Sequence, residues 1–206
     1  MSTRPLIWGA VEGLLDEAVL YRFALEFNFG LEAVYARGGK PSLLKSLRGF
    51  NQAAIHSSWI VMIDLDRDFE CAPMASAVWL PKPSDGMMFN IVVRGLESWL
   101  MADREALSDF FSIPKKLIPL APELEDRPKL VMVNLMRKSS RSDIRREMIP
   151  HEGSGREVGR GYTSFLQEYI GKVGNRNVAY WNPHRAAKAS ESLSRCLDRL
   201  QRQFNT

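Results

Sequence analysis

Two short apolar runs in the first third of the chain each end in carboxylates, and they constrain the fold more than any other feature. The first run covers Leu6 to Val11 and precedes Glu12, and the second covers Trp59 to Ile63 and precedes Asp64-Leu65-Asp66-Arg67-Asp68. Such runs are typical of buried parallel strands, and ligands in open α/β sheets bind beyond the carboxyl ends of strands. Both runs therefore place acids at one edge of the predicted sheet.

The residues around these runs predict alternating strands and helices. A helix is expected after Gly13, a strand over Leu31 to Ala36, and a second helix from Pro41. This β-α-β-α-β order predicts a parallel sheet with crossover helices. Further strands are predicted at Met88 to Val93, Leu130 to Leu135 and Val178 to Trp181, and helices from Leu96, from Tyr162 and after Asn182.

The expected fold is α/β, with a mostly parallel central sheet between layers of helices. A length of 206 residues suits one domain, here with a C-terminal helical extension over about residues 162–206. No apolar run approaches the roughly 20 residues that cross a bilayer. The run from Leu6 to Val11 is too short for a signal peptide, so a cytoplasmic location is expected.

Two residue types give little support for a zinc or disulfide site. Cys71 and Cys196 lie far apart with no paired C-x-x-C spacing. The three histidines, His56, His151 and His184, also lack metal-ligand spacing. Crowded carboxylates instead favour a hard cation, because Mg²⁺ and Mn²⁺ prefer oxygen ligands. The candidate ligands are Glu12, Asp64, Asp66 and Asp68, with Asp16 as a residue that orients its neighbours.

The net charge of +4 permits a polyanionic partner, and one segment concentrates the cations. It contains Arg137, Lys138, Arg141, Arg145 and Arg146. These side chains are candidates for phosphate contacts in nucleic acid, which would make binding fall steeply with added salt. The alternative is a solvated basic face.

Four further residues are candidates for supporting roles near the acidic edge. Asp103 falls on the apolar stripe of the helix predicted from Leu96, and Glu97 lies near the start of that helix. A buried carboxylate needs a partner, which for Asp103 is either a cation site or a hydrogen bond to backbone or arginine. Arg94 and Lys129 flank predicted strand ends and could neutralise a phosphate.

The acidic motifs resemble those of a known fold. The Glu12-Gly13 turn with Asp16, read with Asp64 to Asp68, is similar to the paired signatures of the Toprim domain of topoisomerases, bacterial primases and overcoming-lysogenization-defect nucleases. The segment from Glu97 to Asp103 resembles the Glu-x-Trp-Leu-x-Ala-Asp signature of small bacterial Toprim-like proteins. Those proteins are often encoded beside an ABC-type or AAA-type ATPase and are linked to phage defence.

The resemblance implies a Toprim-like nuclease that uses Mg²⁺ or Mn²⁺ to cleave DNA or RNA, with an ATPase as partner. Glu12, Asp64 and Asp66 would be the catalytic residues, binding one or two ions, and Glu12 could instead act as general base or acid. A non-catalytic module that binds the ATPase and an enzyme acting on small nucleotides stay as alternatives. So does a solvated turn for Asp64 to Asp68, and the oligomeric state is left open.

Overall fold

The computed structural model of this protein describes residues 4–36, 38–171 and 180–204. The chain forms two compact units: unit 1 contains Met1–Val93 together with Arg195–Thr206, and unit 2 contains Arg94–Ser194. The predicted domain over residues 1–206 thus contains two separately packed parts. Within the described ranges, no helix has both the length and the apolar character needed to span a bilayer.

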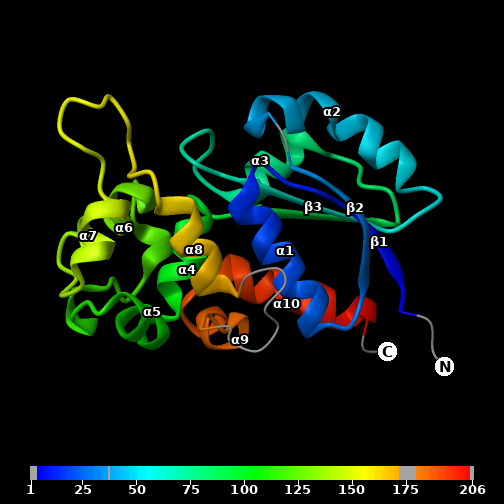
Figure 1. Cartoon of the computed structure of the whole chain (residues 1–206). Coiled ribbons are helices and arrows are strands. Elements are labelled where there is room, and N and C mark those ends of the chain that lie inside the picture. Colours follow the sequence, from blue (N-terminus) through cyan, green and yellow to red (C-terminus); the bar gives the residue numbers. More distant parts are fainter. Residues whose placement is uncertain (1–3, 37, 172–179, 205–206) are drawn as a thin grey trace. The chain divides into compact units, whose positions relative to one another are not determined.

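Unit 1 is built on a four-stranded parallel sheet (Figure 1). The strands are β1 (Leu6–Ala10), β2 (Gly30–Tyr35), β3 (Trp59–Asp64) and β4 (Met87–Val92), in the spatial order β2-β1-β3-β4. Every pairing is parallel, so the carboxyl ends of all four strands lie at one edge. The predicted α/β class with a parallel sheet is confirmed.

Helices cover both faces of this sheet, which gives unit 1 three layers (Figure 1). Because strand residues alternate between faces, Val61 and Ile63 pack with α2 (Gly39–Ala53) and α3 (Ala72–Trp79). The other face carries α1 (Leu14–Glu26) and the unit 1 part of α10 (Glu191–Phe204). The ring of Phe204 lies 4.8 Å from that of Phe29, measured between centroids, which anchors the end of α10 on unit 1.

Unit 2 consists of helices around its own core. They are α4 (Leu96–Ala102), α5 (Arg104–Phe111), α6 (Pro128–Met136), α7 (Ser142–Met148), α8 (Tyr162–Ile170), α9 (Pro183–Ala186) and the 3₁₀ turns η1 (Lys115–Leu117), η2 (Pro122–Leu124) and η3 (Ala187–Ala189). Trp99 and Trp181 are fully buried in this core. The predicted N-cap of α9 is confirmed, since the side chain of Asn182 accepts a hydrogen bond from the Arg185 amide.

Two predictions for unit 2 are wrong. The strand predicted over Leu130 to Leu135 is the helix α6, which starts at Pro128. A short run that is apolar on all sides suits a buried helix as well as a buried strand, so periodicity alone could not separate them. The helix predicted from Leu96 is interrupted at Asp103, whose ψ of 70° is not helical. Of the strand predicted at Val178 to Trp181, the first two residues lie outside the described ranges, and Tyr180 and Trp181 are not part of a strand.

Candidate metal and phosphate site

The first acidic pair meets across the two central strands of unit 1. β1 and β3 are parallel neighbours, with Ala10 beside Val61, so their carboxyl ends emerge together. Glu12 follows β1, and its Oε1 accepts a hydrogen bond of 2.9 Å from the backbone amide of Asp64 at the end of β3. The two strand ends that the sequence predicted to converge are therefore in contact.

A short turn after β3 presents the other two acids. Asp66 adopts φ of 47°, in the left-handed region, which turns the chain sharply after Leu65. Leu65 itself is completely buried, and its amide donates to the carbonyl of Val92 in β4. Buried leucine thus fixes the turn, while the side chains of Asp66 and Asp68 remain 58% and 45% exposed.

Lys40 joins Asp66 and Asp68 at this edge, and sequence reasoning missed it. Its Nζ lies 2.5 Å from Asp66 Oδ2 and 2.8 Å from Asp68 Oδ2. It also lies 5.6 Å from the centroid of the Trp79 ring, within the range of a cation–π contact. The ammonium group therefore lies between two of the four predicted ligands.

Glycines place Lys40 at this position. Gly38 and Gly39 both have positive φ, of 91° and 65°, which side chains with a Cβ rarely adopt. They form the turn from the end of β2 into α2, so Lys40 stands in the first turn of α2 at the carboxyl edge of the sheet. A lysine next to a glycine pair after a parallel strand was the signal that could have identified it.

The shared charges change the proton affinities of the cluster. Burial raises the pKa of the Glu12 carboxyl, and the nearby charges of Asp66 and Asp68 raise it further, against lowering contributions from the Asp64 amide and Lys40. Burial lowers the pKa of Lys40, but its hydrogen bonds to Asp66 and Asp68 outweigh this and raise it overall. A raised pKa suits Glu12 to accept or release a proton.

The donor chemistry of the cluster suits a hard cation, but its present arrangement does not form a metal cage. Carboxylate oxygens are the ligands that Mg²⁺ prefers. Within the parts of the chain that the structure describes, no three Asp, Glu, His or Cys side chains are grouped so as to hold an ion. Asp66 and Asp68 point instead to Lys40. A divalent ion would therefore have to displace the Lys40 ammonium.

Asp16 supports the turn that carries Glu12. Its Oδ2 accepts a hydrogen bond of 3.1 Å from the Gly13 amide at the start of α1, and the side chain is buried. An acid in the first turn of a helix also interacts favourably with the helix dipole. Asp16 thus holds the turn that follows Glu12.

The Glu-x-Trp-Leu-x-Ala-Asp segment serves the packing of unit 2. Glu97 is buried and accepts a hydrogen bond of 3.0 Å from the Tyr162 hydroxyl. The indole nitrogen of Trp99 donates to Ser192 Oγ, and the Trp99 carbonyl accepts from the indole of Trp181. Burial and the adjacent Glu97 raise the pKa of Tyr162 well above its ordinary value. These contacts tie α4 to α8 and to the C-terminal part of unit 2.

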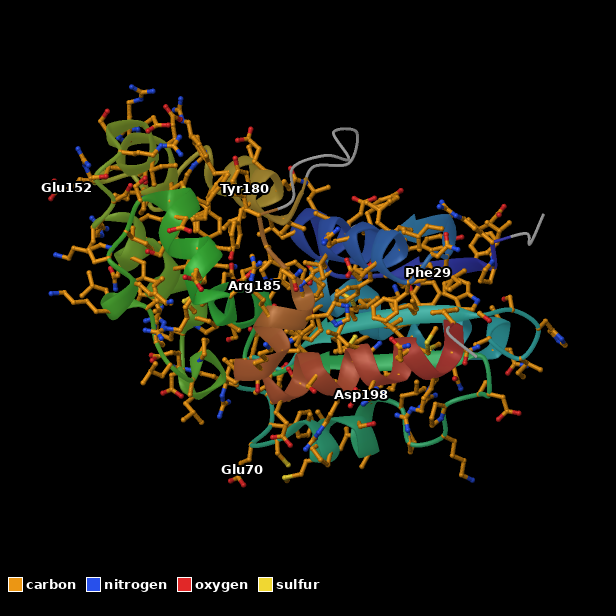
Figure 2. All side chains as sticks on the ribbon, turned by 90° about the horizontal axis from the view of Figure 1, so that it is seen from below. Phe29, Glu70, Glu152, Tyr180, Arg185 and Asp198 are labelled. Atoms are coloured by element: carbon orange, nitrogen blue, oxygen red, sulfur yellow. The ribbon has the colours of Figure 1, made fainter. Side chains whose placement is uncertain are left out.

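Asp103 is held by arginine and backbone, so the second of its two predicted alternatives is confirmed. It is 2% exposed and accepts hydrogen bonds from Arg185 Nη2 at 2.8 Å and from the Asn182 amide at 2.9 Å. Figure 2 shows Arg185, which also donates to the carbonyl of Tyr180. The hydrogen bond to Asp103 raises the pKa of Arg185. The carboxylate is therefore already satisfied within unit 2.

The remaining supporting candidates have different outcomes. Arg94 follows β4, with φ of 63° in the left-handed region. Lys129 lies in α6 and flanks no strand end, which corrects its predicted position. The correction follows directly from the helical state of residues 128–136, since a strand there was the reason for choosing Lys129.

The basic segment is partly committed to local contacts. Arg141 forms a two-point pair with Asp143 and also donates to the Phe110 carbonyl. Arg145 donates to the Ser139 carbonyl, and Arg146 pairs with Glu147 at 2.8 Å. The other two cations, Arg137 and Lys138, are exposed at the end of α6. The segment is thus a basic surface in which some cations have local acceptors.

Comparisons with protein-family models, with curated proteins and with solved structures found no match to this chain. The resemblance to Toprim proteins therefore depends on the sequence motifs alone. At this edge of unit 1 the structure shows carboxylates at the ends of two central parallel strands, and Lys40 binds two of them.

Proposed function

We propose that this chain is a phosphodiesterase that acts on nucleic acid and uses Mg²⁺ or Mn²⁺ at the Glu12, Asp64, Asp66 and Asp68 edge. The observation that carries the proposal is the contact of Glu12 with the Asp64 amide across neighbouring strands, which gathers the acids at the carboxyl edge of the sheet. Ligands collect at this edge in open α/β sheets. The motif resemblance points in the same direction.

The environment of each residue suggests a different role for it. Asp64, Asp66 and Asp68 would hold the ion, which when bound polarises a phosphoryl group and activates water. Glu12, with its raised pKa, would exchange a proton with the attacking water or the leaving oxygen. Lys40, released from Asp66 and Asp68, would be a nearby cation for a phosphate oxygen.

Unit 2 would contribute attraction for the polyanion. It contains 17 of the 28 Lys and Arg residues and 13 of the 24 Asp and Glu residues, a difference equal to the whole net charge of +4. Arg137 and Lys138 are exposed and available for phosphate contacts. An ABC-type or AAA-type ATPase partner and a role in phage defence are part of this proposal and are supported by the motif resemblance alone.

The test is cleavage of DNA and RNA panels in Mg²⁺ and in EDTA. Glu12→Gln and Asp64→Asn should abolish cleavage, because each removes the charge of one proposed catalytic carboxylate. Glu12→Gln keeps an acceptor for the Asp64 amide, so the loss would not come from that contact. Asp85→Asn is the matched control, since Asp85 is exposed and precedes the amino end of β4, whereas the proposed site lies at the carboxyl ends of the strands. Cleavage that persists in both acid variants, or that EDTA leaves unchanged, would contradict the proposal.

The pairing of Lys40 favours a second candidate function. An ammonium bound by Asp66 and Asp68 is also what a purely structural ion-pair network would contain. The chain would then be a non-catalytic module that binds an ATPase. Calorimetric titration with Mg²⁺ and Mn²⁺ separates the two candidates, because the module has no need to bind either ion, and heat of binding lost in Asp64→Asn would favour the enzyme.

A further inference from the structure

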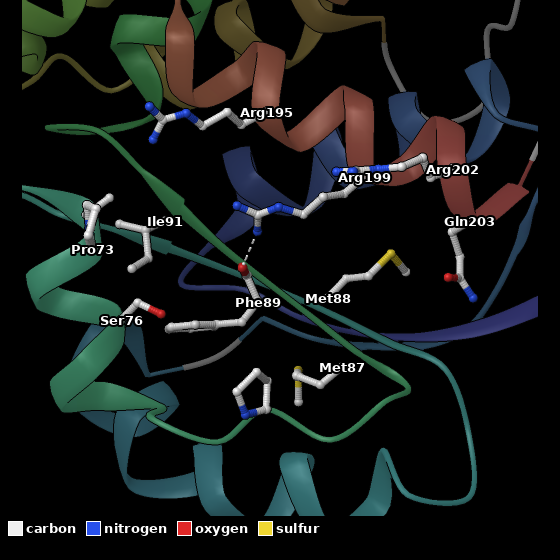
Figure 3. A pocket seen from close by; sticks show the side chains of 12 residues that line it. Pro73, Ser76, Met87, Met88, Phe89, Ile91, Arg195, Arg199, Arg202 and Gln203 are labelled. Atoms are coloured by element: carbon white, nitrogen blue, oxygen red, sulfur yellow. Dashed lines mark hydrogen bonds between the residues drawn. The ribbon is translucent and has the colours of Figure 1, made fainter.

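Among the described residues of unit 1, β4 has a neighbouring strand on one side only, and a cavity lies on its other side. A cavity of about 560 Å³ follows β4, which is the last strand of the sheet (Figure 3). It is bordered by α3 on one side and by α10 on the other. Its lining consists of Ala72, Pro73, Ser76, Pro83, Met87, Met88, Phe89, Ile91, Arg195, Arg199, Arg202 and Gln203.

The backbone of β4 presents hydrogen-bonding groups to this cavity. The carbonyls of Gly86 and Val92 accept from the β3 side, at the amides of Trp59 and Leu65. Backbone groups alternate in direction along a parallel strand, so those of Phe89 and Ile91 point away from β3. The Phe89 carbonyl confirms this direction, because it accepts a hydrogen bond of 2.6 Å from Arg199 Nη1.

The two borders of the cavity differ in chemistry. α10 contributes Arg195, Arg199 and Arg202, spaced four and three residues apart on one side of the helix (Figure 3). α3 contributes only small or apolar residues and one serine. No Asp or Glu is among the twelve lining residues. A strand placed in the cavity would therefore face cations on one side and a small, largely apolar surface on the other.

The spacing of the arginines suits an extended chain. Four residues of helix rise about 6 Å and three rise about 4.5 Å, whereas two residues of strand extend about 6.6 Å, a difference that long arginine side chains can span. Side chains on one face of a strand recur every second residue. Acidic side chains at alternate positions of a strand would thus approach successive arginines of α10, while the residues between them would face α3.

We propose that β4 binds an extended acidic segment of a partner protein by strand addition, with acidic residues alternating with small apolar ones. The main-chain hydrogen bonds come from Phe89 and Ile91, and the charge selectivity comes from the three arginines. In the unbound protein Arg199 covers the edge by holding the Phe89 carbonyl, as charged side chains commonly protect edge strands. On binding, its guanidinium moves to a carboxylate of the segment.

The experiment measures fluorescence anisotropy of labelled six-residue peptides, matched to the length of β4, against the full chain. The probe alternates Glu and Val. Three comparison peptides have alternating Lys and Val, the Glu and Val residues in two blocks, or methyl groups on the backbone nitrogens that would pair with β4. Methylation leaves the charge intact and removes only the main-chain donors, so it isolates strand addition from simple charge attraction.

The variant that tests the arginines is Arg195→Glu/Arg202→Glu, whose two sites are exposed. Lys45→Glu/Arg48→Glu on the exposed side of α2 is the matched control with the same change of net charge. Circular dichroism verifies that both variants are folded. The alternating acidic probe should bind, and it should bind about tenfold or more weakly to the α10 variant, while the α2 variant leaves its affinity unchanged.

Four results would overturn the proposal. They are no binding of the probe, equal binding of the blocked or methylated peptide, equal loss in the α2 variant, and full displacement by inorganic polyphosphate with no preference for alternation. The last result would assign the arginines to a general anion site. None of these outcomes depends on whether the Glu12 edge cleaves nucleic acid.

Discussion

The acids of unit 1 and unit 2 differ in how their charge is satisfied. In unit 2, Asp103 has an arginine and a backbone amide, and Glu123 accepts from Ser190, Ser192 and the Glu191 amide. In unit 1, Asp66 and Asp68 both bind the ammonium of Lys40, whose charge also acts on Glu12. Acids with dedicated donors stabilise a fold, whereas carboxylates crowded at a sheet edge around a shared ammonium are candidates for a ligand site.

The largest expected loss of stability follows from removing an acid that already has dedicated hydrogen-bond donors. Asp103→Ala should lower the free energy of unfolding by about 2 kcal/mol, because it removes a buried acceptor from the Asn182 amide and from Arg185. Urea denaturation followed by circular dichroism measures it. Asp68→Ala, at a half-exposed position, should cost less than about 1 kcal/mol. Equal losses of unfolding free energy in the two variants would contradict the difference between the acids of the two units.

Lys40→Met should strengthen Mg²⁺ binding, because it removes the ammonium that competes for Asp66 and Asp68. We expect the dissociation constant to fall about tenfold, which corresponds to about 1.4 kcal/mol. Isothermal titration calorimetry gives the constant directly, with Lys45→Met on the same helix as control. Weaker binding in Lys40→Met would mean that the lysine organises the acids for the ion.

Glu12→Gln should raise the free energy of unfolding of the metal-free protein at neutral pH, because the raised pKa of Glu12 means that the folded protein disfavours its charged form. Burial and the charges of Asp66 and Asp68 oppose ionisation of Glu12, and glutamine keeps an acceptor for the Asp64 amide without the charge. The gain should shrink as the pH is lowered, since the wild-type carboxyl then becomes increasingly protonated and loses the charge that the fold disfavours. Thermal unfolding across this pH range is the measurement, and a destabilised Glu12→Gln at pH 7 would contradict it.

The smallest effect concerns the two thiols of unit 1 and leaves stability untouched. Burial raises the pKa of Cys196 on α10 to about 12, while Cys71 is exposed. At pH 8 a thiol reagent should therefore modify Cys71 alone, because the thiolate is the reactive form. The number of thiols that react is measured spectrophotometrically, with Cys71→Ser as the reference. Modification of Cys196 in the native protein would show that residues 195–204 leave unit 1.

The meeting of Glu12 with Asp64 could be predicted because a parallel sheet brings all carboxyl ends of its strands to one edge. The pattern of apolar residues did not indicate the position of Lys40, because the two positive-φ glycines before it decide where it lies. Helix α6 was missed for a related reason. Its apolar residues 130–135 suit either a buried helix or a buried strand, and only the neighbours of unit 2 select between them.

Glu97 and Asp103 illustrate the limit of motif reading. Their positions in the Glu-x-Trp-Leu-x-Ala-Asp segment indicated acids near a strand end, and the sequence left open whether Asp103 serves a cation or a hydrogen bond. The partners that decide this, Tyr162 and Arg185, lie 65 and 82 residues away along the chain. No local pattern carries information about contacts at such separations.

The sequence by itself determined the parallel α/β sheet and the edge at which its acids emerge, because strand periodicity and chain direction are local properties. The tertiary structure decided which acids are satisfied, where Lys40 binds and which edge of the sheet stays open beside the arginines of α10. Those outcomes depend on charges and hydrogen-bond donors brought together from distant segments, whose energies exist only after the chain has packed.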